Sequence, residues 1–267
     1  MIRMRTVRTR ITLKGAADFL EIASLGVSRK SVKMQQADEY AYVGNELALF
    51  LHATNWKTYW ASRIRPFIRG RVLDVGAGLG ATFDYLGDAA DQWTCLEPDP
   101  KLCEQFRARL ATRVRPPHVL CGTSAVLEAE ERFDTVLYVD VLEHIEQDRA
   151  ELQSIMRHLE PGGSLIVLSP ALPFLYSPFD KSIGHFRRYT SRTLSQVTPA
   201  GSTVKTWFYL DGIGVLASLF ARVARRAAPT PAQVNTWDKA IVPVSRLTDS
   251  LTSRLFGRTI VMVWTKD

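Results

Sequence analysis

Between residues 71 and 169, short apolar runs rich in β-branched residues alternate with longer stretches of helical periodicity. The runs that predict strands cover residues 71–75, 92–96, 118–121, 133–139 and 164–168. The apolar positions at helical spacing are Leu102, Phe106 and Leu110 in one stretch and Leu152, Ile155, Met156 and Leu159 in another. Strand–helix alternation of this kind indicates a parallel sheet with crossover helices.

The flanking regions extend this α/β pattern. Residues 37–68 are rich in aromatic residues and predict helices ahead of the first strand. Residues 171–190 are polar and aromatic, and too irregular to predict a strand or a long helix. Two more strands are predicted over 203–209 and 258–265, with an amphipathic helix over 213–226 and a helical segment up to Phe256 between them.

Charge divides the chain unevenly. Residues 1–33 contain eight Lys or Arg and two Asp or Glu, whereas the remaining chain contains 26 and 25. We therefore expect a basic, flexible extension over 1–33, a helical cap over 34–70 and a main domain over 71–267, with lid and acceptor elements at about 171–190 and 211–256. A solvated extension is the favoured interpretation of the basic segment, and contact with nucleic acid or an anionic membrane is the alternative.

The composition, with 46% hydrophobic and 23% charged residues, is that of an ordinary globular protein and excludes disordered and fibrous classes. No uncharged apolar run reaches the roughly 20 residues that span a bilayer. The three cysteines form no CxxC pair, which argues against a disulfide framework and a zinc cluster. We therefore expect a reduced, cytoplasmic protein and predict no metal site.

Two motifs follow the first two predicted strands. Gly76, Gly78 and Gly80 come directly after the 72–75 run, so the backbone can turn tightly and approach a ligand without a Cβ in the way. Glu97 ends the second strand, 21 residues after Gly76, where a carboxylate can accept hydrogen bonds from both hydroxyls of a ribose. Both NAD and S-adenosylmethionine carry that ribose, so these two motifs leave the cofactor open.

Two later motifs separate these cofactors. Residues 133–144 form a strand that ends in the polar cluster Asp140, Glu143 and His144, and residues 159–165 form a helix end, a Pro-Gly-Gly turn and a new strand. Together with the glycine loop and Glu97, they resemble the class I S-adenosylmethionine-dependent methyltransferases. The polar grouping over 180–189 and the aromatic residues of 55–60 resemble the small-molecule branch of these enzymes, with type 11 or type 23 character. The resemblance to the class covers residues 71–169. It implies a Rossmann-like, seven-stranded, mostly parallel sheet with helices on both faces, an N-terminal helical cap and lid insertions.

The resemblance also implies a cofactor site for S-adenosylmethionine. Its residues would be Asp74, Gly76, Ala77 and Gly78 around the methionine part, Glu97 on the ribose, Pro98 beside the adenine, Gly122 and Thr123 at the adenine amine, and Asp140 and Val141 under the sulfonium. Many relatives read the adenine amine with an acid. This chain has none there before Glu128, so a backbone contact is expected instead.

The acceptor side is expected in the segment after the fifth strand, because ligands of open α/β sheets lie outside the carboxyl ends of the strands. His185 is the base candidate there, since the pKa of imidazole lies near neutrality. The alternative is a loop-folding histidine hydrogen-bonded to Asp180, and both interpretations stand. The same two interpretations apply to His144. Asp140 is the third catalytic candidate. For Arg187 and Arg188 a role in bracing the loop is favoured over gripping an anionic acceptor.

The predicted helix over 213–226 aligns Leu216, Leu219, Phe220 and Val223 on one face, with arginines beside it. Packing of this stripe on the sheet is the favoured interpretation. The alternative is that a basic amphipathic helix lies on an anionic membrane or covers an apolar substrate. A peripheral membrane contact would then run through this helix or through the basic extension.

The sequence thus predicts an enzyme that transfers a methyl group from S-adenosylmethionine to an O or N nucleophile of a small-molecule acceptor, with a lipid-linked or sugar-like acceptor included. A nucleic-acid or protein methyltransferase and a non-catalytic S-adenosylmethionine-binding subunit are the alternatives. Nucleic acid is not the expected partner, because no Asn-Pro-Pro-aromatic run ends the fourth strand and the body beyond residue 33 is near neutral. The sequence leaves the acceptor and the oligomeric state undefined.

Overall fold

The computed structural model describes residues 46–223 and 228–267, which belong to one compact unit that runs from Tyr42 to Asp267. The predicted extension over 1–33 lies outside the described residues, as do residues 34–45 of the predicted cap and 224–226 of the predicted amphipathic helix. Among the described residues no helix combines the length and the apolar character needed to cross a membrane.

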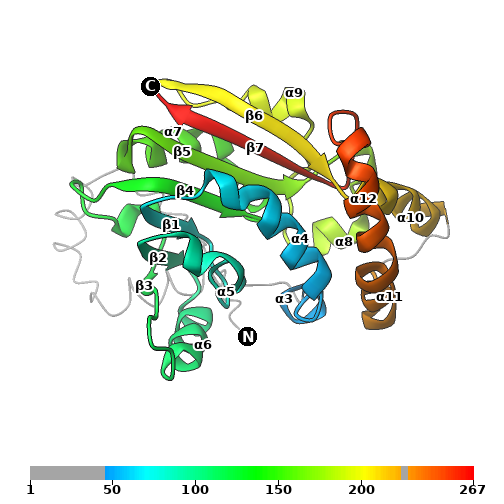
Figure 1. Ribbon diagram of the computed structural model, residues 1–267, viewed down its shortest axis with the longest axis horizontal. Coiled ribbons are helices and arrows are strands. Elements are labelled where there is room, and N and C mark those ends of the chain that lie inside the picture. The colour runs from blue at the N-terminus through cyan, green and yellow to red at the C-terminus, as the bar shows by residue number, and fades with distance from the viewer. Residues whose placement is uncertain (1–45, 224–227) are drawn as a thin grey trace, which may run out of the picture. The chain divides into compact units, whose positions relative to one another are not determined.

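One mixed sheet organises the part of the chain that the structure describes, and its strand order is β3-β2-β1-β4-β5-β7-β6 (Figure 1). The strands are β1 (Arg71–Val75), β2 (Gln92–Glu97), β3 (His118–Cys121), β4 (Phe133–Val139), β5 (Leu159–Pro170), β6 (Ser202–Leu210) and β7 (Thr259–Lys266). The first five are parallel, and β7 lies antiparallel between β5 and β6. The predicted Rossmann-like, mostly parallel sheet is therefore confirmed.

Helices connect the strands and cover both faces of the sheet. They are α3 (Glu46–Leu49), α4 (Thr54–Ile64), α5 (Ala81–Leu86), α6 (Pro100–Leu110), α7 (Asp148–Ile155), α8 (Pro178–Ser182), α9 (Ser191–Ser195), α10 (Gly212–Val223), α11 (Pro231–Thr236) and α12 (Val242–Thr252). The predicted start of α6 has the expected cause, because the Asp99 carboxylate accepts from the N–H groups of Lys101 and Leu102 at 2.7 and 3.3 Å.

Two apolar layers lie on opposite faces of the sheet, because alternate strand residues point to opposite sides. One layer joins Val72 of β1 to Trp60 and Ile64 of α4, and the other joins Leu73 of β1 to Leu152 and Ile155 of α7. The aromatic residues ahead of the first strand therefore pack on the sheet itself. The carboxyl ends of the five parallel strands carry the candidate site.

The structure corrects the predicted beginning of the fifth strand. We predicted a Pro-Gly-Gly turn followed by a strand from Ser164, but β5 begins at Leu159. Leu159 already pairs with Phe133 of β4, and the register then shifts so that Ser164 pairs with Thr135. The glycines therefore form an irregularity within the strand, and Gly162 has a φ of 72°. The strand begins before the glycines because the buried Leu159 is already held in the sheet.

The favoured packing of the predicted apolar stripe on the sheet is wrong for Leu216 and Leu219, the two stripe residues whose side chains the structure describes. Leu216 and Leu219 of α10 do not pack on the sheet, and Leu216 is 62% exposed. The buried side of α10 is the side of Val215. The orientation of α10 is fixed in its first turn, where the N–H of Gly212 donates to Asp249 and the N–H of Gly214 donates to Asp211.

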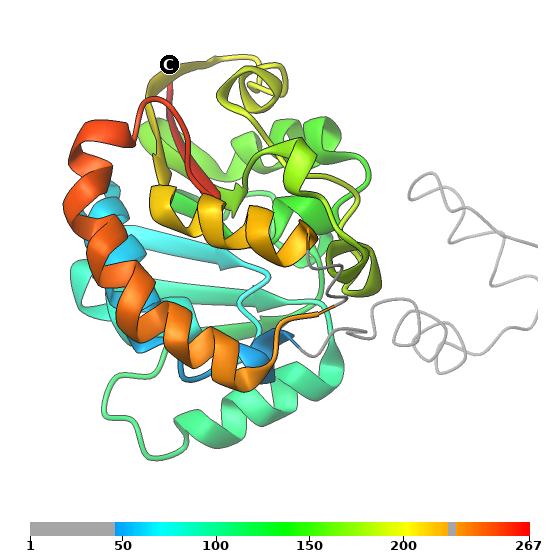
Figure 2. The ribbon, with the colours of Figure 1, turned by 90° about the vertical axis from the view of Figure 1, so that its right-hand side faces the viewer.

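Helix α12 turns its polar side inward. Ser245 and Asp249 are buried, whereas Leu247 and Leu251 are 77% and 84% exposed. Asp249 Oδ2 accepts from Tyr59 Oη of α4 at 2.8 Å, and the Ser245 hydroxyl donates to Asp211 at 2.7 Å. Figure 2 shows α11 and α12 as one continuous helical arm beside the sheet, in orange and red-orange. Buried hydrogen bonds therefore fix the orientation of α12 and direct its leucines outward.

Candidate functional site

The glycine loop between β1 and α5 forms the floor of the candidate site. Gly76, Gly78 and Gly80 all have positive φ values, of 68°, 56° and 81°, which favour glycine. The N–H groups of Gly76 and Ala77 donate to the carbonyl of Leu96 at 2.7 and 3.0 Å. These bonds tie the loop to the carboxyl end of β2, where Glu97 lies.

Glu97 joins three of the predicted cofactor segments. Its carboxylate accepts from the N–H of Gly78 at 2.7 Å and from that of Asp99 at 2.9 Å, and its carbonyl accepts from Gly122 N–H at 2.8 Å. Burial raises the pKa of Glu97, and the N–H groups of Asp99 and Gly78 oppose the rise. Each carboxylate oxygen keeps a second lone pair, so Glu97 can accept from two ribose hydroxyls.

Asp74 lies in β1 directly before the glycine loop and is buried. Burial raises the pKa of its carboxyl group to about 8, and the negative charge of Glu97 adds to the rise. Asp74 Oδ2 and Trp93 Nε1 both have no hydrogen-bond partner among the described residues. The interior thus holds a carboxyl group with spare hydrogen-bonding capacity beside the loop.

The other two adenine-side candidates, Pro98 and Thr123, follow the ends of β2 and β3. Pro98 is half-buried after β2, and Thr123 follows the hydrogen-bonded Gly122 after β3. The Thr123 hydroxyl accepts from Ala125 N–H at 3.4 Å and caps a short turn. Gly122 has a φ of 151°, and a Cβ there would lie 2.4 Å from Val126 Cγ1.

Asp140 and Val141 bring the end of β4 against the glycine loop. A Cβ on Gly76 would lie 2.6 Å from Val141 Cγ2, so the loop and this segment are in close contact. Asp140 is exposed and has a φ of 54°, which is uncommon for a residue with a side chain. Its N–H donates to the Leu168 carbonyl at 2.8 Å. Left-handed backbone of this kind clusters at ligand sites.

Glu143 lies three residues further on and is fully buried. Its Oε2 accepts from the Ser169 hydroxyl at 2.8 Å, whereas Oε1 has no hydrogen-bond partner among the described residues. Burial raises the pKa of Glu143 well above its usual value, and the negative charge of Asp140 adds to this. We named Glu143 in the motif but not among the catalytic candidates, because a buried orientation is not visible in the sequence.

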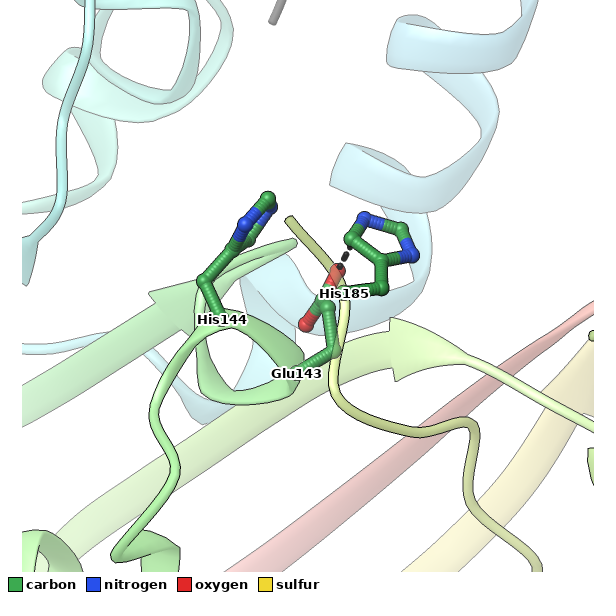
Figure 3. A group of neighbouring side chains, drawn as sticks. All are labelled: Glu143, His144 and His185. Atoms are coloured by element: carbon green, nitrogen blue, oxygen red, sulfur yellow. Dashed lines mark ion pairs between the residues drawn. The ribbon is translucent and has the colours of Figure 1, made fainter. Parts of the chain in front are cut away.

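His144 and His185 meet beside Glu143, although 40 residues separate them (Figure 3). Their rings are in edge-to-face contact with centroids 4.6 Å apart. His185 Nε2 lies 3.8 Å from Glu143 Oε1, and His185 Nδ1 lies 3.0 Å from Asp180 Oδ1. Burial and the neighbouring His185 lower the pKa of His144 to about 4, so its ring is neutral near pH 7.

Asp180 orients His185 and organises the loop that carries it. The carboxylate also accepts from the Ser177 hydroxyl at 2.7 Å and from two Arg188 nitrogens at 2.9 and 3.1 Å. Burial alone would raise the pKa of Asp180, but the hydrogen bond from His185 and the charge of Arg188 hold it below its usual range. Because an ionised carboxylate only accepts hydrogen bonds, His185 Nδ1 is the donor in its bond to Asp180, and Nε2 faces Glu143.

Both arginines of the predicted acceptor segment are engaged within the fold. Arg188 makes the forked pair with Asp180, and Arg187 Nη1 lies 2.6 Å from Asp148 Oδ2. These contacts brace the segment against α7 and α8. The structure therefore gathers the predicted residues into two adjoining groups, the glycine-loop group around Glu97 and the polar group around Glu143, His144 and His185, in contact through Gly76 and Val141.

Comparison with known proteins gives the class of this domain. A family model described as a methyltransferase domain matches residues 73–165. The tRNA U34 carboxymethyltransferase of Pseudoalteromonas atlantica is 32% identical over 121 residues, which are 43% of this chain and 38% of that protein. The ubiquinone biosynthesis O-methyltransferase of Methylobacterium nodulans is 32% identical over 93 residues, which are 34% of this chain and 37% of that protein. The chain thus matches less than half the length of either relative.

A solved structure extends the likeness over most of the chain. It is an S-adenosylmethionine-dependent methyltransferase of Thermotoga maritima, described as a possible histamine N-methyltransferase. The likeness covers 85% of this chain and 96% of that one, with a TM-score of 0.59 and 18% identity, and it shows the fold. The fold and the family model define a class I methyltransferase domain. Residues 73–165 thus match a methyltransferase domain, and the fold is that of the S-adenosylmethionine-dependent class I methyltransferases, as the sequence predicted. S-adenosylmethionine is the cofactor that this domain and fold imply.

Proposed function

We propose that the protein transfers a methyl group from S-adenosylmethionine to an oxygen or nitrogen nucleophile of a small-molecule acceptor. The observation that carries the proposal is the contact between the glycine-loop group and the polar group, through Gly76 and Val141. A methyl donor held by the first group would present its sulfonium beside the second. Alignment of donor and nucleophile is the main requirement of an in-line displacement.

The residues that would hold the cofactor fit its parts. The glycine loop leaves room for the methionine part, since a Cβ on Gly78 would have its nearest neighbour, Leu47, at 3.6 Å. The spare hydrogen-bonding capacity of Asp74 suits an ammonium group, and the free lone pairs of Glu97 suit a ribose. Ala77, Pro98, Gly122, Thr123, Asp140 and Val141 complete the proposed cofactor set. When bound, the cofactor supplies an electrophilic methyl group on a positive sulfur.

The polar group would receive the nucleophile of the acceptor and its proton. His185 is the proposed base, because the hydrogen bond from Nδ1 to Asp180 directs the lone pair of Nε2 into the group. His144 is neutral and adjoins it, and Asp140 contributes negative charge at the exposed side. A proton taken from a hydroxyl or ammonium group would therefore enter a cluster of two imidazoles and two carboxyl groups.

The outward leucines of α12 and Leu216 of α10 favour a lipid-linked acceptor within this class. Between residues 228 and 256, both acidic residues, Asp238 and Asp249, are buried, whereas Lys239 and Arg246 are exposed. Exposed apolar side chains in a segment whose exposed charged residues are all basic suit an anionic membrane surface. We propose peripheral contact there, in the cytoplasmic setting that the unpaired cysteines favour.

A nucleic-acid acceptor is the competing proposal, because one curated relative is a tRNA carboxymethyltransferase. Our preference for a small molecule rests on the enclosed polar group, in which Glu143 is fully buried. Turnover assays that measure released S-adenosylhomocysteine separate the two. Hydroxylated small molecules, lipid-linked sugars and tRNA are offered in parallel, and methylation of tRNA alone would contradict the proposal.

Cofactor binding is tested by calorimetric titration with S-adenosylmethionine, S-adenosylhomocysteine and NAD. We expect binding of the first two and a loss of about 100-fold in Glu97→Ala, since hydrogen bonds to a charged group contribute about 1.5–3 kcal/mol each. Glu104→Ala, an exposed acid of α6, is the matched control and should bind normally. Binding of NAD alone would overturn the assignment.

His185→Ala should bind S-adenosylhomocysteine normally and lose about 100-fold or more of turnover.

A further inference from the structure

We propose that Glu143, His144 and His185 form a binding site for one divalent transition-metal ion. One potential ligand atom of each residue lies within 4.8 Å of the ligand atoms of the other two. Glu143 and His144 come from the short turn after β4, and His185 comes from the loop after α8. In Figure 3 the Glu143 carboxylate reaches from the turn toward His185, with the His144 ring beside it.

The second observation is the unpaired oxygen of Glu143. Oε1 is buried and accepts no hydrogen bond from the described residues, although Oε2 of the same group is bonded to Ser169. An unsatisfied buried polar atom costs on the order of 1–3 kcal/mol, and more when the group is charged. A cation bound to Oε1 would remove that cost and would balance the charges of Glu143 and Asp140.

The distances favour a shared cation over a direct hydrogen bond. At 3.8 Å, His185 Nε2 and Glu143 Oε1 are too far apart for a hydrogen bond. Two ligands of one zinc-like ion, each bonded at about 2.0–2.2 Å, lie roughly 3–3.5 Å apart. A small side-chain rotation closes the remaining gap. No other group of at least three His, Cys, Asp or Glu residues within the described ranges meets the same spacing.

The surroundings of His185 are those of a metal ligand. Its Nδ1 is held by the Asp180 carboxylate, which is itself held by Arg188 and Ser177. Histidines that bind metals commonly donate their other ring N–H to a carboxylate in this way, which fixes the tautomer and the ring orientation. His144 is positioned independently, by a hydrogen bond with the backbone of Gly184.

Two imidazoles and one carboxylate select the class of ion. This mixed nitrogen and oxygen set suits Zn²⁺, Co²⁺, Mn²⁺ or Fe²⁺, whereas Mg²⁺ and Ca²⁺ prefer oxygen ligands throughout. Three protein ligands leave coordination positions for a further ligand. The sequence-based expectation of no metal site rested on the cysteines, and this set contains none.

The role of the ion rests on the proposed function, whereas its binding does not. With the ion bound, the imidazoles act as ligands and an acceptor hydroxyl oxygen occupies an open position. Metal coordination lowers the pKa of that hydroxyl, and its proton passes to water. The acceptor oxygen then forms a bond to the methyl carbon while the carbon–sulfur bond breaks, which yields the methyl ether and S-adenosylhomocysteine. The proposal therefore selects oxygen acceptors over nitrogen acceptors.

The test is titration of the full chain, freed of any histidine tag and treated with a chelator, with Co²⁺ alone. Binding is followed by calorimetry and by the visible absorption of the ion. We expect one equivalent bound at micromolar or lower concentration, with absorption typical of nitrogen and oxygen ligation. Glu143→Gln, His144→Gln and His185→Gln should each weaken binding by about 100-fold or more, and Asp180→Asn by about 10–100-fold.

Three controls keep the outcome decisive. His118→Gln, at an exposed histidine of β3, should bind Co²⁺ normally, and so should Cys121→Ser, which removes the exposed thiol. Binding of S-adenosylhomocysteine verifies that each variant is folded. Wild-type protein that binds S-adenosylhomocysteine but binds Co²⁺ no better than the Glu143→Gln variant would overturn the metal site. Absent cofactor binding would instead overturn the proposed function.

Discussion

At the scale of single residues, the buried acids carry most of the information about the site. Asp74, Glu97 and Glu143 end or follow three neighbouring parallel strands, and burial raises the pKa of each. Three buried carboxyl groups do not stabilise a fold by themselves, because removing a charged group from water costs free energy. Their position at the carboxyl edge of the sheet, where open α/β sheets bind ligands, supports the proposal that they serve ligand binding.

The first prediction concerns Asp74 and pH. With its pKa raised to about 8 by burial, the folded state binds a proton that the unfolded state, with a pKa near 3.9, releases. The contribution of Asp74 to the free energy of unfolding is therefore fully present below about pH 4 and falls as pH rises to about 8. Urea denaturation of the cofactor-free protein should show Asp74→Asn gaining stability relative to wild type between pH 5 and pH 8. A constant difference across that range would contradict the raised pKa.

The positions of the proposed cofactor residues at the strand ends could be predicted from the sequence, but the neighbours of the catalytic candidates could not. Gly78, Glu97 and Gly122 join as expected because each lies at a strand end, and strand ends can be read from hydrophobic runs. The meeting of His144 with His185 depends on the course of the loop around α8. That course is determined by the Asp180 contacts with Ser177 and Arg188, and no periodicity in the sequence encodes them.

At the scale of elements, the positions of the strands could be predicted from the sequence, whereas the orientations of two helices could not. All the strands of the described sheet were predicted within a few residues of their observed bounds, apart from the early start of β5. The outward faces of α10 and α12 were not predicted, because apolar stripes usually point inward. Here a buried network of Asp211, Ser245 and Asp249 occupies the inner side, so hydrogen bonding overrides the apolar pattern.

The second prediction concerns the beginning of α4. Its own N-cap position, Ala53, has no side chain to accept a hydrogen bond, and the buried Asp238 accepts from the N–H groups of Asn55 and Trp56 at 3.2 and 2.8 Å. Asp238→Ala should lower the free energy of unfolding by about 1–3 kcal/mol, because two backbone N–H groups, one of them buried, lose their acceptor. Asp88→Ala, which removes an exposed partner of Arg65, should change it by less than about 1 kcal/mol. Equal effects in urea denaturation would show that Asp238 does not cap α4.

At the scale of the whole molecule, two features compete to explain any attraction to anionic surfaces. The sequence of residues 1–33 carries a large positive excess, and the described body exposes leucines beside Lys239 and Arg246. A purely electrostatic contact weakens steeply with salt, whereas burial of apolar side chains persists. Salt dependence therefore distinguishes the two contributions without knowledge of the acceptor.

The last prediction uses this difference. Full-length protein should sediment with vesicles that contain anionic lipid, and removal of residues 1–33 should weaken binding mainly at low salt. The double variant Leu247→Gln and Leu251→Gln should weaken it by about tenfold or more at high salt as well, since each leucine contributes about 1.5 kcal/mol or more when buried. Val114→Gln, at an equally exposed apolar residue between α6 and β3, is the matched control. If the double variant binds as the control does, the leucines of α12 do not contact the membrane, and the case for a lipid-linked acceptor loses its structural support. Cofactor binding should remain normal in the leucine and Val114 variants, because none of these three described residues contacts the glycine loop or Glu97.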